Sequence, residues 1–311
     1  MTYVRLTDGM LKALVGEVVD IGSYDYARNK ARGGASGKKG ARYEDYVTAY
    51  LMAELLCEML RRQPCMCWPR LISQDFGFVD DVTVASGDAT VFHQLKNVQA
   101  LSWSSGPHPL EDDFRLQLTV ANALRWPNPS TVLFTSDHSV VQSMRSAMPT
   151  DLVSSAKVRH FPFDIANVLV QTFSPLRDVL IPLARTSNPS NDELGNVLGA
   201  LISSLSRASD EVSVEALLHM AQGQSPTLIR LFPHQMAGVE LAPQVVSVLD
   251  GIPGFCYCFD RGFFEWRCGS DSGVFSFSCL DHRFRRFQEL ASAQKPETFE
   301  DLENILGCFC E

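Results

Sequence analysis

The sequence predicts an α/β protein in which residues 1–140 form a first part and residues 141–311 a second part of different texture. In the first part, a long helical pattern is followed by two short strand-like runs, a second helical pattern and a further apolar run. That order of elements is typical of an α/β fold. The second part starts with helical patterns and ends with short strands separated by glycine-containing turns, which indicates helices followed by a β-meander.

Composition places the chain among folded globular proteins. It has 311 residues, 45% of them hydrophobic and 20% charged, which is enough for two domains. No apolar run approaches the length of a membrane span, and the amino terminus lacks the basic-then-apolar pattern of a secretory signal, so we expect a cytoplasmic protein. The net charge of −9 argues against a surface that is basic throughout, but it allows a local basic groove.

A glycine-rich basic stretch precedes the first long helix. Its Gly33–Gly37 core predicts flexibility, and no acid occurs among its basic residues. It can be a flexible loop, an arm that contacts phosphates, or both. The candidate DNA-binding residues are Arg28, Lys30, Arg32, Lys38, Lys39 and Arg42.

The clearest helix is predicted from about Ala41 to Arg62, before Pro64. Its apolar residues recur at steps of three and four, which gives one buried face. Glu44 lies in the first turn, where the helix dipole favours a carboxylate whatever its function. The competing interpretation is a role in a cation site, for which the adjacent Asp45 is the alternative.

A β-hairpin is predicted from residues 78–84 and 90–97, joined by a turn at Ser86-Gly87-Asp88. Alternate residues of a strand share a face, so Gln94 and Lys96 project together and Asp81 can face them. Asp80 remains an alternative to Asp81, although the more polar face favours Asp81. His93 projects from the opposite face and is interpreted as a packing residue or as a residue that supports the site from behind.

The remaining elements follow from the same patterns. We expect a helix over 111–124 and a buried parallel strand over 131–135. Beyond them, residues 163–223 predict helices, the second of which could be capped by the Asn191-Asp192 pair. Strands are expected over 255–259, 262–268 and 274–279, followed by helices over 281–293 and 298–306.

Nine cysteines are scattered along the chain, three pairs of them as Cys-x-Cys. Zinc sites usually have wider spacing. Alternation along a strand places Cys256 and Cys258 on one face, as small core residues would be, so we expect buried reduced thiols.

Residues 40–137 resemble the PD-(D/E)xK, or restriction-endonuclease-like, superfamily. The resemblance rests on Tyr43-Glu44 in a helix, then Asp81, and then Gln94-Leu95-Lys96 on a strand. The form with Gln in place of the second acid is similar to Mrr-type restriction enzymes and to the double-stranded DNA endonuclease domains of CBASS-type antiphage effectors. The resemblance implies a restriction-endonuclease-like αβββαβ core ahead of the helical and β-meander part.

The resemblance also implies a Mg²⁺- or Mn²⁺-dependent DNA endonuclease. Asp81 would be the principal metal ligand, Glu44 and the backbone carbonyl of Leu95 further ligands, and Lys96 the residue that orients or deprotonates the attacking water. Gln94 removes a negative charge from the usual pattern, which leaves an inactive adaptor as the alternative. The implied partners are double-stranded DNA, a second copy of the chain, and an ATPase or helicase encoded nearby in a bacterial antiphage defence system.

Overall fold

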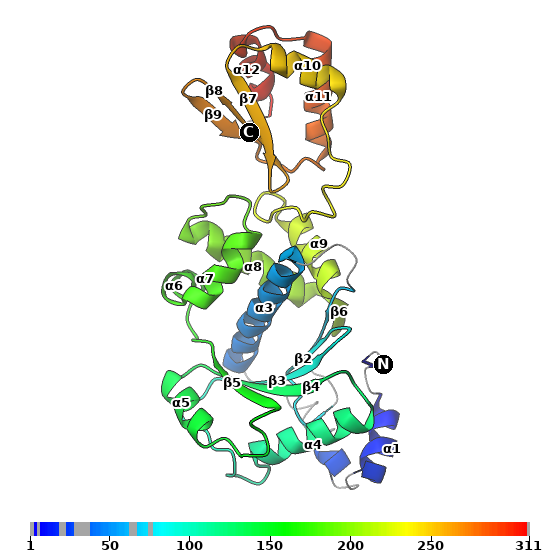
Figure 1. The fold of residues 1–311 in the computed structure, drawn as a ribbon. Helices are drawn as coiled ribbons and strands as arrows, with labels where there is room; N and C mark the ends of the chain where they lie inside the picture. The colour runs from blue at the N-terminus through cyan, green and yellow to red at the C-terminus, as the bar shows by residue number, and fades with distance from the viewer. Residues whose placement is uncertain are drawn as a thin grey trace.

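A computed structural model describes residues 3–4, 7–18, 23–27, 38–61, 67–73 and 77–309. The protein is mixed α/β, with a six-stranded mixed sheet and a separate three-stranded antiparallel sheet (Figure 1). Among the described residues, no helix combines the length and the apolar character needed to cross a membrane.

The six-stranded sheet has the strand order β5-β4-β3-β2-β1-β6. The predicted hairpin is confirmed, because β2 and β3 pair antiparallel, and the predicted parallel strand is confirmed as β4, which pairs with β3. β5 and β6 were not predicted; both are short, and none of the three residues of β6 is buried. The strands are β1 (Arg70–Ser73), β2 (Val82–Ala85), β3 (Thr90–Lys96), β4 (Pro129–Thr135), β5 (Ala156–His160) and β6 (Glu211–Ser213).

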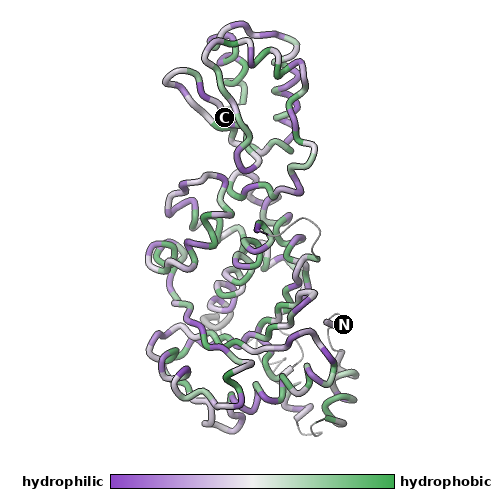
Figure 2. The backbone as a smooth tube through the Cα atoms, viewed as in Figure 1, coloured by the Kyte–Doolittle hydropathy of each residue, from purple (hydrophilic) through white to green (hydrophobic). Residues whose placement is uncertain are grey.

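Helices cover both faces of this sheet (Figure 1). On one face lie α1 (Asp8–Val18), α4 (Leu110–Ala123) and α5 (His138–Ser146). On the other face lies α3 (Lys38–Arg61), close to its predicted bounds, with its apolar side buried against the sheet and the helices beyond. Figure 2 shows hydrophobic and hydrophilic residues alternating along these helices, as their amphipathic patterns require.

The helical layer around α3 consists of α6 (Ala166–Thr172), α7 (Ser174–Leu180), the short 3₁₀ helix η1 (Ile181–Leu183), α8 (Asn191–Arg207) and α9 (Val214–Gln224). The predicted Asn191-Asp192 cap of α8 is wrong, because Asn191 is already the first helical residue. Ser190 is the cap instead. It accepts from the Glu193 amide at 3.2 Å, while the Glu193 carboxylate accepts from the Ser190 amide at 2.7 Å.

Residues 241–309 have a hydrophobic core of their own. It consists of α10 (Pro243–Gly251), β7 (Phe255–Asp260), β8 (Phe263–Cys268), β9 (Asp271–Val274), α11 (His282–Gln294) and α12 (Phe299–Gly307). The boundary predicted between residues 140 and 141 falls within α5, and buried residues from both sides of it share the cores of the large sheet. The meander is present, but its third strand lies earlier than the predicted 274–279, and α10 was not predicted.

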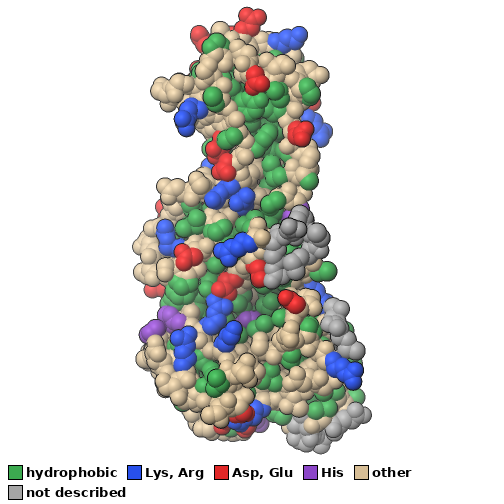
Figure 3. Space-filling model, in the orientation of Figure 1, with side chains coloured by type: hydrophobic (Ala, Val, Ile, Leu, Met, Phe, Trp, Pro, Cys, Tyr) green, Lys and Arg blue, Asp and Glu red, His purple; other side chains and the backbone are tan. Residues whose placement is uncertain are grey.

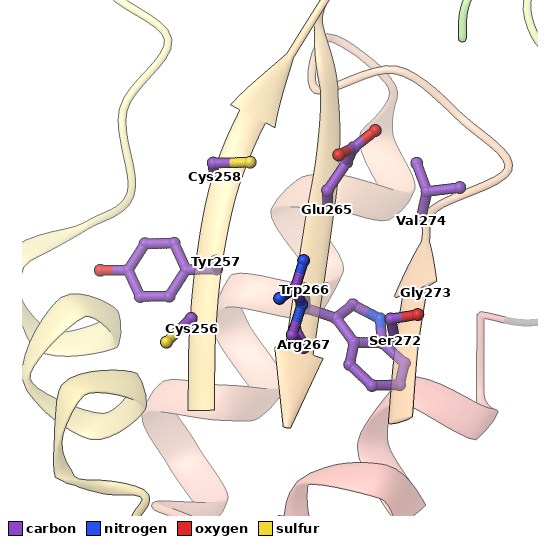
Figure 4. A pocket seen from close by; sticks show the side chains of 9 residues that line it. All are labelled: Cys256, Tyr257, Cys258, Glu265, Trp266, Arg267, Ser272, Gly273 and Val274. Carbon is purple, nitrogen blue, oxygen red and sulfur yellow. The ribbon is translucent and has the colours of Figure 1, made fainter. Parts of the chain in front are cut away.

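The prediction of buried thiols is wrong for Cys256 and Cys258, which are exposed on the outer face of β7 (Figure 4). Both remain free thiols. Their neighbour Phe255 is buried on the inner face, against the core of α11 and α12. Alternation correctly put the two thiols on one face, but the larger aromatic side chains take the side that excludes most water.

Arg261 joins the two parts of the molecule from the turn between β7 and β8. Its side chain is 16% exposed, and its guanidinium donates to the carbonyls of Ile181, Ala184 and Thr186 at 3.0, 3.0 and 2.7 Å. Its own carbonyl accepts from the Leu231 amide at 2.8 Å. Those three carbonyls belong to the end of the helical layer, so the guanidinium fastens the small sheet to it.

Replacing Arg261 with asparagine tests this fastening. Asparagine tolerates the φ of 52° found at this position. Loss of the charged donor leaves carbonyls without a partner, which we expect to cost about 2 kcal/mol or more of unfolding free energy. Urea denaturation measures the change, and limited proteolysis should cut faster between α9 and α10. Arg267→Asn, at an exposed arginine on β8, is the control, and equal behaviour of the two variants would contradict the role of Arg261.

Candidate functional site

Asp81 lies directly before β2, where its carboxylate reaches across to β3. The register that pairs Val82 with His93 places Asp81 opposite Gln94. Asp81 Oδ2 accepts the Leu95 backbone N–H at 2.6 Å and also accepts the side-chain amide of Gln94. The described residues donate no hydrogen bond to Oδ1. One carboxylate oxygen is therefore fixed by β3 while the other remains available to a ligand.

Gln94 and Lys96 lie on the same face of β3, because residues two apart in a strand project to the same side. Gln94 is fully buried, whereas Lys96, at the end of the strand, is half-buried. The contact between Gln94 and Asp81 shows that this is also the side to which Asp81 projects. The structure therefore places the acid, the amide and the amine at one end of the hairpin.

Glu44 lies near the start of α3 and is half-buried. Its pKa is raised to about 7, chiefly by burial and next by the negative charge of Asp81, while the positive charge of Lys96 lowers it. Asp45 and Asp80 add smaller repulsions. These charge effects indicate that Glu44 lies near Asp81 and Lys96, while Asp81 contacts Gln94 directly.

Asp80 and Asp81 differ in their surroundings. Asp80 is 6% exposed and contributes to raising the pKa of Tyr26, whose hydroxyl donates to Asp113 of α4 at 3.0 Å. Asp81 is partly exposed and bonded to β3. The contacts favour Asp81 as the acid that faces the site and place Asp80 in the buried layer behind it.

Sequence reasoning missed Gln117, which holds the loop that carries both acids. Gln117 Oε1 accepts from the backbone amides of Phe78 and Val79 at 2.8 and 3.2 Å. Gly77 makes this approach possible, because a Cβ at Gly77 would lie 2.5 Å from the same oxygen. A signal was present: Gln117 is three residues after Phe114 and four before Ala121, so it falls on the buried stripe of α4.

The carboxyl ends of the parallel strands extend the same edge of the sheet. Strand register aligns Lys96 with Thr135 of β4 and with His160 of β5. The His160 ring is 5.4 Å from that of His138, and burial lowers the pKa of His160. Ligands bind at such strand ends in open α/β sheets. Sequence reasoning did not identify His160, because β5 itself was not predicted.

The predicted DNA-binding residues lie mostly outside the described residues. Arg28, Lys30 and Arg32 belong to segments that the structure does not describe, as do the side chains of Lys38 and Lys39 at the start of α3. Arg42 is exposed, with its guanidinium 5.8 Å from the centre of the Tyr46 ring. Figure 3 shows Lys and Arg side chains interleaved with Asp and Glu on the visible face.

His93 and a groove on the small sheet are distinct from this site. His93 is buried, with Nδ1 3.1 Å from the Val82 carbonyl, and burial lowers its pKa to about 4, which agrees with the predicted packing role. A groove of about 600 Å³ crosses the small sheet and is lined by Cys256, Cys258 and Trp266 (Figure 4). None of the predicted site residues lines it.

The donors at the hairpin end fit a hard divalent cation. The side-chain ligand atoms are the carboxylate oxygens of Glu44 and Asp81, without thiol or imidazole. The Leu95 carbonyl adds an oxygen on the same edge of β3 as its N–H, which points to Asp81. Repulsion between Glu44 and Asp81, seen in the raised pKa of Glu44, is what a bound cation would relieve.

Comparisons of the chain with family models, with curated proteins and with solved structures find no match.

The charge coupling at this site can be measured in the metal-free protein. Asp81→Asn removes a repulsive charge, so we expect the pKa of Glu44 to fall by roughly one unit while burial keeps it above the ordinary value. Lys96→Met removes an attraction and should raise it. Carboxyl-carbon NMR titration in EDTA reports both changes. Asp151→Asn, which changes an exposed carboxylate paired with Arg115, is the control. A Glu44 titration unchanged in Asp81→Asn would show that the two acids are not neighbours.

Proposed function

We propose that this protein is a metal-dependent DNA endonuclease of the PD-(D/E)xK superfamily, in its Gln-x-Lys form. The observation that carries the proposal is the contact of Asp81 with Gln94 and Leu95 of β3, with Lys96 on the same face of that strand and Glu44 near enough for the charges of Asp81 and Lys96 to shift its pKa. The order α3, β1, β2, β3, α4, β4, with β4 parallel to β3, supports it, because this is the αβββαβ order of that superfamily.

In this proposal Glu44, Asp81 and the Leu95 carbonyl hold Mg²⁺ or Mn²⁺, which would neutralise phosphate charge and activate water when bound. Lys96 would have one of two roles: its ammonium pairs with a phosphate oxygen and positions the attacking water, or its neutral amine accepts a proton from that water. Gln94 and the Leu95 amide fix the orientation of Asp81, and Gln117 fixes the loop before it.

The biological setting follows from the same resemblance. A nuclease of this form would act on double-stranded DNA, and cutting both strands is best served by two copies of the chain. Such nucleases occur as effectors or subunits of antiphage defence systems. An ATP-driven step would need an ATPase or helicase from another chain. Residues 241–309, with their separate core, are the part best suited to sensing a signal or binding that partner.

One observation favours the inactive adaptor as a second candidate. The Asp81 carboxylate is already bonded to Gln94 and to the Leu95 amide, and a pKa of about 7 leaves Glu44 substantially protonated at neutral pH. A nuclease-like fold with these properties could bind DNA or a partner protein without holding a cation.

DNA cleavage separates the two candidates. Plasmid and linear DNA are incubated with the protein and Mg²⁺ or Mn²⁺, with EDTA as the metal-free reference. We expect cleavage that is lost in EDTA. Lys96→Ala should reduce cleavage by at least about 10²-fold, because Lys96 positions or deprotonates the attacking water in this proposal. Lys157→Ala, at an exposed lysine on β5 of the same sheet, should keep wild-type activity.

Folding of each variant is checked by circular dichroism. If the wild type does not cleave, alone or with proteins encoded beside it, the adaptor is favoured. Equal cleavage by Lys96→Ala and wild type would remove Lys96 from the mechanism.

A further inference from the structure

We propose that Glu215, His219 and His234 form a second cation site, which binds a transition-metal ion of the Zn²⁺ class. The ligand atoms of these three side chains all lie within 4.8 Å of one another. None of them takes part in the Glu44–Asp81 site, and the site is independent of the nuclease proposal.

The three ligands come from two segments of the chain. Glu215 and His219 are four residues apart in α9, so they lie one turn apart on the same helix face. His234 comes from the turn that leads out of the helical layer towards α10. Glu215 Oε1 and His234 Nε2 are 3.9 Å apart. Around a tetrahedral Zn²⁺ ion, N and O ligand atoms lie roughly 3.3–3.5 Å from one another. Both histidines are exposed, so small side-chain rotations can close the difference.

The turn that carries His234 is held in place by protein contacts alone. The side chains of Gln222 in α9 and Gln235 donate to each other at 3.1 and 2.8 Å. Gln235 also accepts from the Phe232 amide at 2.8 Å, and Phe232 is buried. The Trp68 ring packs edge-on against His234 with centroids 5.6 Å apart. His234 is therefore presented to α9 before any ion binds, which lowers the entropic cost of binding.

The donor set determines the kind of ion. Two imidazoles and one carboxylate suit Zn²⁺, Co²⁺ or Ni²⁺, whereas Mg²⁺ and Ca²⁺ prefer oxygen ligands throughout. Three protein ligands leave a fourth position for water. This preference differs from that of the Glu44–Asp81 site, whose side-chain donors are oxygens, so the two sites can be told apart by metal.

A bound ion would tie the turn after residue 231 to α9. This turn begins the connection between the large sheet with its helices and residues 241–309 (Figure 1). Leu231, at the start of the turn, also donates its amide to Arg261. The ion would therefore stabilise the attachment of the small sheet and its helices at the point where Arg261 fastens it.

Metal titration of the full chain tests the site. After treatment with EDTA and dialysis, the protein is titrated with ZnCl₂ by calorimetry and with Co²⁺ by visible absorption. We expect one ion per chain, the d–d bands of a four-coordinate Co²⁺ centre, and a higher melting temperature with Zn²⁺. Loss of a residue that only hydrogen-bonds a metal ligand weakens metal binding roughly 10–100-fold. His219→Gln and His234→Gln each remove a ligand itself, so each should weaken Zn²⁺ binding by more than this.

A control variant makes the result specific. His282→Gln changes an exposed histidine in α11 and should bind Zn²⁺ as the wild type does. Because His219 and His234 are exposed, we expect their variants to fold as the wild type does, and circular dichroism checks this. Absence of Zn²⁺ binding by the wild type, or wild-type affinity in the His219→Gln/His234→Gln double variant, would overturn the proposal.

Discussion

The contact between the Asp81 carboxylate and β3 is the constraint on which the candidate site depends. A carboxylate that accepts a backbone N–H and a side-chain amide on one oxygen has little rotational freedom. The direction of the other carboxylate oxygen is thereby fixed by the same two contacts. Gln94 is useful here as a donor, a role that a glutamate at the same position could not take while ionised. In the proposed nuclease, Gln94 would therefore support Asp81 instead of binding the metal itself.

The position of this contact depends on packing at both faces of the sheet. On one face, α3 brings Glu44 over the end of the hairpin because its apolar stripe is buried against the strands and α8. On the other, Gln117 of α4 receives the two amides that precede Asp80. Packing of α3 and α4 on opposite faces therefore affects how far Glu44 and Asp81 lie from each other. Burial is the main cause of the raised pKa of Glu44, and repulsion from Asp81 adds to it.

The two proposed cation sites differ in the part of the molecule they would affect. The oxygen-rich site lies at the end of the central hairpin, where a cation would face substrate. The imidazole-containing site lies between α9 and the connection to the small sheet, where a cation would act on attachment. Arg261 makes a fixed, charged contact at that same connection. In the described part of the chain, the hydrogen bonds of Arg261 contribute to attaching residues 241–309, which makes this connection a suitable place for regulation.

The sequence by itself determined the elements with strong local signals. The periodicity of α3, the turn between β2 and β3, and the apolar run of β4 each identify their element without tertiary information. Strand alternation was also sufficient to put Asp81, Gln94 and Lys96 on one side, since side-chain direction in a strand depends only on residue parity. Only the tertiary structure decided which face of β7 is buried, that β5 and His160 extend the sheet edge, and that His234 meets α9. These features depend on contacts between residues far apart in the chain. A local sequence pattern does not show which surfaces pack against each other and become buried.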